Sequence, residues 1–89
     1  MNTELVFIDD EEDILNLLRL KFRSLAKKDG MTLRLFSTSS EFEEYIKSVQ
    51  TDIMVVVSDI NMPNNKVLES LKKEKNRFKF SLTYLCSAY

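Results

Sequence analysis

Acidic residues directly follow two apolar runs of the sequence. Asp9 and Asp10 come after "ELVFI" (residues 4–8), and Asp59 ends "DIMVVVSD" (residues 52–59). Carboxylates placed side by side repel one another, so such a cluster is unfavourable unless a cation lies between them. With no histidine or cysteine among the three, the all-oxygen set suits a hard cation such as Mg²⁺. The alternative is that Asp9 and Asp10 only cap a helix and Asp59 only begins a turn.

The elements that must position these acids alternate along the chain. Apolar runs predict strands at 4–8, 32–36 and 52–59 and a fourth within 78–89. Helical spacing of apolar residues predicts helices within 10–30, 37–50 and 61–78, and Pro63 lies near the start of the last one. This order predicts an α/β fold with a parallel sheet and helices on its faces. Ligands collect at the carboxyl ends of parallel strands, so the three acids converge if the first and third strands are neighbours.

Three local expectations accompany this pattern. Asp9 and Asp10 should supply the capping oxygens of the first helix, and Thr38, three residues before Glu41, should cap the second. The continuous β-branched run at 52–59 predicts a strand covered on both faces. Cys86, in the apolar-leaning "LTYLCSAY", is expected to be a buried, reduced thiol.

Composition limits the classes of function. At 89 residues, the chain has room for one domain, residues 1–89. A formal net charge of −1 gives no global attraction to nucleic acid or membrane, and the apolar runs are too short to cross a bilayer, so we expect a cytoplasmic protein. The absence of histidine excludes His-based catalytic triads and His-rich metal sites, and a single glycine excludes a Gly-rich phosphate loop.

Three segments resemble parts of the receiver domain of bacterial two-component response regulators. "VFIDDEEDIL" is similar to that family's acidic pair after the first strand, and "VVVSDINMP" is similar to its phosphoacceptor segment after the third strand. "LCSAY" resembles the end of its fourth strand, where a Ser or Thr precedes Ala. The resemblance spans all 89 residues and implies a parallel sheet with flavodoxin-like (receiver) topology.

The resemblance also implies roles for individual residues. Asp59 would accept the phosphoryl group, and Ser87 would hydrogen-bond the phosphoryl oxygens. Asp10 and Asp59 would ligate Mg²⁺ directly, Asp9 would do so through water, and the backbone carbonyl of Asn61 would complete the protein ligands. Because the chain has no histidine, the phosphodonor must be a sensor histidine kinase, a phosphotransfer protein or a small molecule.

The sequence departs from the family pattern in two places. The family has an acid and a glycine soon after Met-Pro, where this chain has Lys66 and Val67. Family members also continue for a fourth helix, a fifth strand with a phosphate-pairing lysine, and a fifth helix, whereas this sequence ends at Tyr89. We therefore expect a single receiver-like domain that lacks these last elements. Tyr84 and Tyr89 are expected to be core or edge aromatics.

Three functions follow as alternatives. The first is a two-component signal transduction receiver, phosphorylated at Asp59 with Mg²⁺ and not otherwise an enzyme. The second is a degenerate receiver that acts only in self-association or protein interaction. The third is a Mg²⁺-dependent phosphohydrolase, for which Asn61 stands where such enzymes carry a second acid. Since residues 81–89 contain no charge, proline or glycine, we also expect an unprotected sheet edge and a homodimer rather than a stable monomer.

Overall fold

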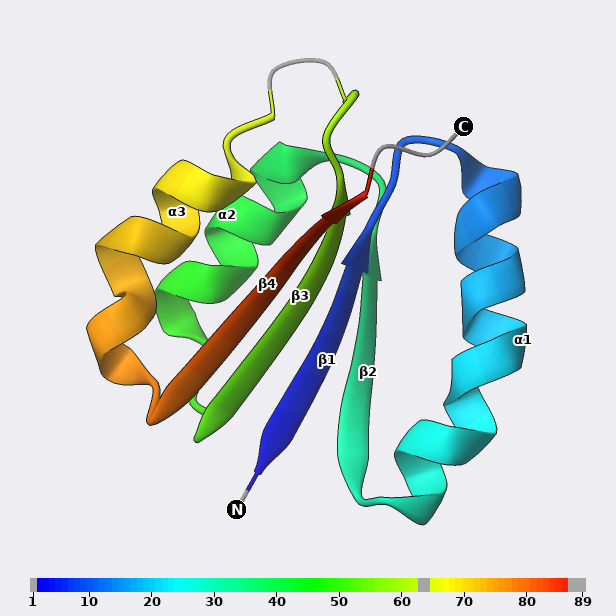
Figure 1. Ribbon diagram of the computed structural model, residues 1–89, viewed down its shortest axis with the longest axis horizontal. Coiled ribbons are helices and arrows are strands. Elements are labelled where there is room, and N and C mark those ends of the chain that lie inside the picture. The colour runs from blue at the N-terminus through cyan, green and yellow to red at the C-terminus, as the bar shows by residue number, and fades with distance from the viewer. Residues whose placement is uncertain (1, 63–64, 87–89) are drawn as a thin grey trace.

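The computed structural model describes residues 2–62 and 65–86, which form four strands and three α-helices in strict alternation. Figure 1 shows their arrangement. The elements are β1 (Thr3–Ile8), α1 (Glu12–Lys28), β2 (Met31–Phe36), α2 (Ser39–Ser48), β3 (Ile53–Asp59), α3 (Val67–Glu74), a short 3₁₀ turn (Lys75–Arg77) and β4 (Phe80–Cys86). No helix among the described residues is long and apolar enough to span a membrane.

The four strands form one all-parallel sheet in the order β2-β1-β3-β4. This confirms the predicted α/β class, and the order is that of the first four strands of a flavodoxin-like fold. β1 and β3 are neighbours in register, with Leu5 opposite Val55 and Ile8 opposite Ser58. The first and third strands are therefore neighbours, which is the arrangement that the predicted convergence of the three acids required.

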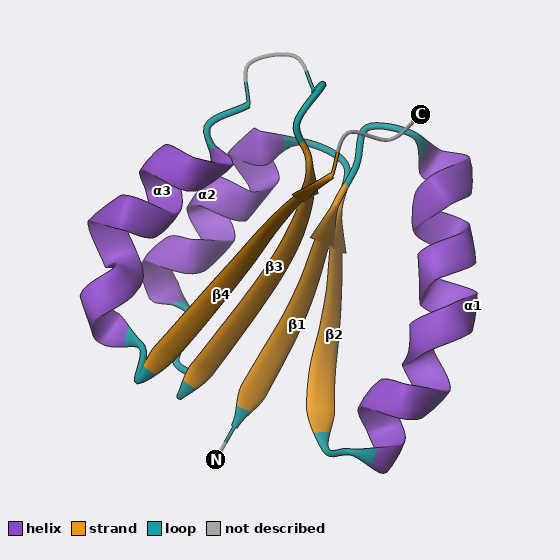
Figure 2. Ribbon diagram, viewed as in Figure 1, coloured by secondary structure: helices purple, strands orange, loops and turns teal. Residues whose placement is uncertain are grey.

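The helices divide between the two faces of the sheet. Figure 2 shows α1 on one side and α2 with α3 on the other. The main core lies under α2 and α3, where side chains of β1 and β3 meet those of the two helices and the adjoining loops. Its fully buried members include Val6, Ile8, Phe42, Ile46, Met54, Val56 and Val67. On the α1 face, Phe7 packs against Phe22 with ring centroids 5.1 Å apart, and Leu15 and Ala26 are buried.

The α1 face is only partly covered, and this corrects two expectations. α1 packs mainly on β2 and β1. The side chains of β3 that face α2 and α3 are therefore buried, whereas Ile53, Val55 and Val57, which face the α1 side, are only half-buried. β3 is thus not covered on both faces, contrary to the prediction from the sequence. Cys86 is exposed rather than buried, because it lies on β4, at the sheet edge that α1 does not reach.

The first helix begins differently from the prediction, whereas the second begins as expected. Helix α1 starts at Glu12, and its N-cap residue is Glu11, whose side chain makes no capping bond, instead of Asp9 or Asp10. Asp9 Oδ1 accepts a hydrogen bond from the Glu11 amide, just before the helix. At α2, the Thr38 hydroxyl accepts from the Glu41 amide at 3.2 Å, which confirms the predicted cap.

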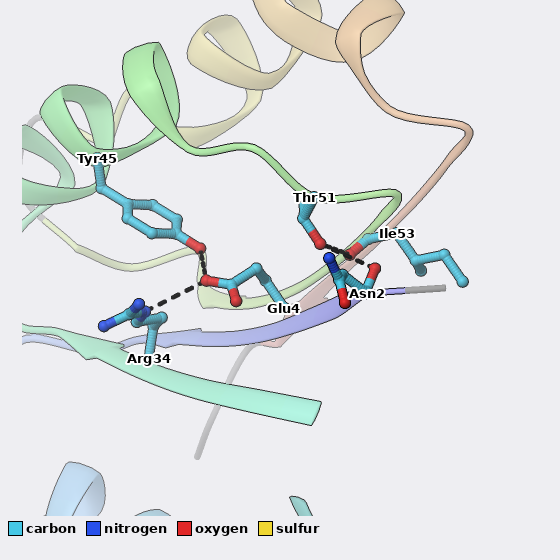
Figure 3. A network of polar contacts seen from close by, with 6 residues as sticks. All are labelled: Asn2, Glu4, Arg34, Tyr45, Thr51 and Ile53. Atoms are coloured by element: carbon cyan, nitrogen blue, oxygen red, sulfur yellow. Dashed lines mark hydrogen bonds and ion pairs between the residues drawn. The ribbon is translucent and has the colours of Figure 1, made fainter. Parts of the chain in front are cut away.

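A polar network ties β1, β2 and α2 together (Figure 3). Glu4 of β1 is buried, and its Oε1 accepts hydrogen bonds from Arg34 Nε of β2, at 3.2 Å, and from the Tyr45 hydroxyl of α2. The Arg34 guanidinium also lies 5.9 Å from the centroid of the Tyr45 ring. A buried carboxylate is thus compensated by one cation and one hydroxyl from two other elements.

Candidate metal centre

The three predicted acids meet at the carboxyl ends of β1 and β3. One carboxylate oxygen from each of Asp9, Asp10 and Asp59 lies within 4.8 Å of the other two. Asp9 and Asp59 are each only 6% exposed, whereas Asp10 is exposed. The cluster thus has a buried pair, with Asp9 directly after β1 and Asp59 at the end of the adjacent β3, and an exposed third member, Asp10.

The two buried acids are oriented by the same local device. Asp9 Oδ1 accepts a hydrogen bond from the backbone amide of Glu11, and Asp59 Oδ1 accepts one from the amide of Asn61, both at 2.9 Å. An aspartate that bonds the amide two residues on forms an Asx turn, which holds the side chain close to its own backbone. The turns after β1 and β3 therefore both fix a carboxylate at the edge of the sheet.

Backbone hydrogen bonds attach these turns to neighbouring strands. The Asp9 amide donates to the carbonyl of Phe36 at the end of β2, and the Ile60 amide donates to the carbonyl of Cys86 at the end of β4, both at 3.1 Å. The positions of Asp9 and Asp59 thus depend on all four strand ends, because each turn is bonded to the strand outside the central pair.

Asn65 is a positioning residue that the sequence did not single out. Its Nδ2 donates to the carbonyl of Asp59 at 2.9 Å, and its Oδ1 accepts from the amide of Val67 at 3.0 Å. The side chain therefore joins the end of β3 to the first turn of α3, where Lys66, the N-cap residue, makes no capping bond. The run "PNNK" gave no indication which of its polar residues would do this.

The donor set fits a small, hard cation. Octahedral Mg²⁺ has oxygen ligands at 2.0–2.1 Å, so adjacent ligand oxygens lie about 3 Å apart and opposite ones about 4.2 Å apart. The carboxylate oxygens of the cluster lie within 4.8 Å of one another, and the Asp10 side chain is exposed. Three carboxylates without nitrogen or sulfur donors favour such a cation over zinc or copper.

A cavity of about 160 Å³ opens beside the acids on the α1 face. Its walls include Ile14 and Leu18 of α1, Val57 of β3 and Cys86 of β4, and Asp9 and Asp59 form its polar end. The lining is mostly apolar, so the two buried carboxylates lie next to an apolar cavity.

The other predicted site residues lie beside the three acids or outside the described residues. Asn61 lies in the turn after Asp59, where its amide holds the Asp59 carboxylate, and its role as a carbonyl ligand stays a prediction. Ser87, the predicted phosphoryl contact, lies outside the described residues, as do Pro63 and Tyr89. Tyr84, expected to be a core or edge aromatic, is 55% exposed on the edge strand.

No family model matches the chain, and no curated protein matches it.

Proposed function

We propose that this chain is a receiver-like module of two-component signal transduction, which accepts a phosphoryl group on Asp59 in the presence of Mg²⁺. The observation that carries the proposal is the convergence of Asp9, Asp10 and Asp59 at the carboxyl ends of two adjacent parallel strands. A sensor histidine kinase or phosphotransfer protein would be the natural donor, because the chain has no histidine of its own.

In this proposal each acid has a distinct role. Asp10, Asp59 and the backbone carbonyl of Asn61 would hold Mg²⁺ directly, and Asp9 would hold it through water. The cation neutralises charge on the phosphoryl group, which a carboxylate alone would repel. The Asn61 amide keeps the Asp59 carboxylate oriented toward the shared site through its bond to Oδ1. A buried nucleophile held in this way needs little reorganisation before transfer.

In the transfer, a carboxylate oxygen of Asp59 replaces the oxygen of the leaving group on phosphorus. With acetyl phosphate as donor, a carboxylate oxygen of Asp59 forms a new P–O bond. The bond between phosphorus and the acetyl oxygen breaks, and acetate leaves with the electron pair. The product is an acyl phosphate on Asp59, which is stable in acid and labile in base.

Intact-mass spectrometry after incubation with acetyl phosphate and Mg²⁺ tests the proposal. We expect one added phosphoryl group, which is absent when Mg²⁺ is chelated and absent in Asp59→Asn. As a matched control, Asp29→Asn removes one exposed carboxylate at the opposite end of α1 and should leave the modification intact. No mass shift, under conditions that phosphorylate a complete receiver, contradicts the proposal and favours an interaction domain. Sustained release of phosphate from phosphoesters would favour a phosphohydrolase instead.

A further inference from the structure

β4 is the most exposed strand of the described chain. Six of its seven residues are exposed, and Thr83 is half-buried. Phe80, Leu82 and Tyr84, which are 63%, 51% and 55% exposed, lie on the α1 side of the sheet because they pair with Ile53, Val55 and Val57 of β3. No charged residue or proline interrupts Phe80–Cys86. Edge strands ordinarily carry such residues, because they prevent pairing with another chain.

The direction of the backbone groups follows from two hydrogen bonds to β3 and its loop. The Phe80 amide donates to the carbonyl of Asp52 at 3.2 Å, and the Cys86 carbonyl accepts from the Ile60 amide at 3.1 Å. Alternate residues of an extended strand direct their N–H and C=O groups to the same side. Residues 80, 82, 84 and 86 thus face β3, and Ser81, Thr83 and Leu85 face outward.

We propose that β4 pairs with β4 of a second copy of this chain, antiparallel about a two-fold axis at Thr83. In that register Thr83 meets its own counterpart and Ser81 meets Leu85, so every outward N–H and C=O of the three residues gains a partner. Registers centred on Leu82 or Tyr84 would instead place one of the three residues opposite a position outside Phe80–Cys86. A two-fold contact of this kind closes on itself and produces a dimer rather than a filament.

The side chains of β4 are compatible with this arrangement. Leu82 would lie opposite the partner's Tyr84, and Phe80 opposite the partner's Cys86, so that apolar side chains of the two copies meet on one face. Cross-strand pairs of this type stabilise antiparallel strands. Because the strand is uncharged, no like charges within it are brought together by the two-fold axis.

The other edge of the sheet does not offer an equivalent surface. β2 carries Arg34 near its middle, and α1 packs against it more closely than against any other strand. A charge on an edge strand opposes pairing with another sheet. Pairing of β4 with β2 of a second copy would also be head-to-tail, which continues into an open assembly. The second copy therefore meets β4 through the same strand.

Two double variants that differ only in the sign of one charge test this register. In Leu82→Lys, Tyr84→Lys, each lysine lies opposite a lysine of the other copy. In Leu82→Lys, Tyr84→Glu, each lysine lies opposite a glutamate. Light scattering and sedimentation at micromolar concentrations should show a wild-type dimer, and about a 100-fold higher dissociation constant for the Lys/Lys variant than for the Lys/Glu variant. Since both side chains are exposed, circular dichroism should show a folded chain in both variants.

Thr83→Pro provides a backbone test of the same contact. Proline is tolerated in an edge strand where the amide faces solvent, so this substitution should leave the bonds between β4 and β3 intact and abolish the dimer. A wild-type chain that is monomeric at every concentration would overturn the proposal. Equal dissociation of the Lys/Lys and Lys/Glu variants, or a dimer that survives Thr83→Pro, would overturn it as well.

Discussion

At the scale of single residues, Asp59 combines burial with two like-charged neighbours. Its side chain is 6% exposed, and an oxygen of Asp9 and one of Asp10 lie within 4.8 Å. Even with effective screening, like charges at this separation oppose folding, and a bound divalent cation reverses the sign of the local interaction. The cluster therefore favours the folded chain when a cation is bound and opposes it when none is.

Thermal melts of the wild type and of Asp59→Asn test this balance. Without metal, Asp59→Asn should raise the free energy of unfolding by about 1 kcal/mol, because one of the three repelling charges is removed while the Asn61 amide keeps an oxygen acceptor. Millimolar Mg²⁺ should raise the melting temperature of the wild type, and the variant should lose most of that increase. Asp29→Asn should respond to Mg²⁺ as the wild type does. A wild-type melt that is insensitive to both Mg²⁺ and Ca²⁺ would mean that the acids do not form a cation site.

The acids were predictable from the sequence, whereas Asn65 and the state of Cys86 were not. Asp9, Asp10 and Asp59 follow apolar runs, and strand ends can be located from such runs. The two hydrogen bonds of the Asn65 side chain depend on the path of the loop after β3. The polar residues of that loop do not by themselves determine this path. The exposure of Cys86 depends on which strand is at the edge of the sheet, a property of topology rather than of local hydrophobicity.

At the scale of elements, the network of Glu4, Arg34 and Tyr45 connects two strands and a helix. The pairing of β1 with β2 places Val6 opposite Arg34, so Glu4 and Arg34 lie on the same face, toward α2. Burial, together with the hydrogen bond to the Glu4 carboxylate, raises the pKa of Tyr45 well above its usual range. The sequence predicted each element, but it did not predict this network, because the network depends on strand register and helix placement together.

This pKa shift predicts a loss of stability in alkaline solution. An unfolded tyrosine titrates near pH 10, so above about that pH the folded chain retains a proton that the unfolded chain releases. The contribution of Tyr45 is therefore fully present below pH 10 and decreases as the pH rises. Tyr45→Phe should cost about 1–2 kcal/mol at neutral pH and should show a weaker decrease between pH 9 and 11. Urea denaturation across this range measures both effects, and parallel pH profiles for the two proteins would contradict the argument.

At the scale of the whole molecule, the described helices cover the two faces of the sheet unequally, with α2 and α3 on one face and α1 on part of the other. The strand order and the core under α2 and α3 agree with the sequence pattern, because continuous apolar runs and helical periodicity favour the same layers. The prediction that β3 would be covered on both faces was wrong, because a β-branched run indicates strand and burial without indicating what lies on each face. On the α1 side, the exposure of Phe80, Leu82 and Tyr84 follows from that incomplete cover.

Hydrogen exchange offers a whole-molecule test that separates the fold from its association. Amides of Leu82 and Tyr84 face β3 and should be protected at any protein concentration, whereas those of Ser81, Thr83 and Leu85 face outward. In a monomer the outward amides exchange rapidly, and in the proposed dimer they are bonded to the second copy. We therefore expect alternating protection along β4 in dilute solution and uniform protection when the protein is concentrated, as measured by residue-resolved NMR. Alternation that persists in samples shown to be dimeric would place the dimer contact elsewhere, since only pairing at β4 supplies acceptors for the outward amides.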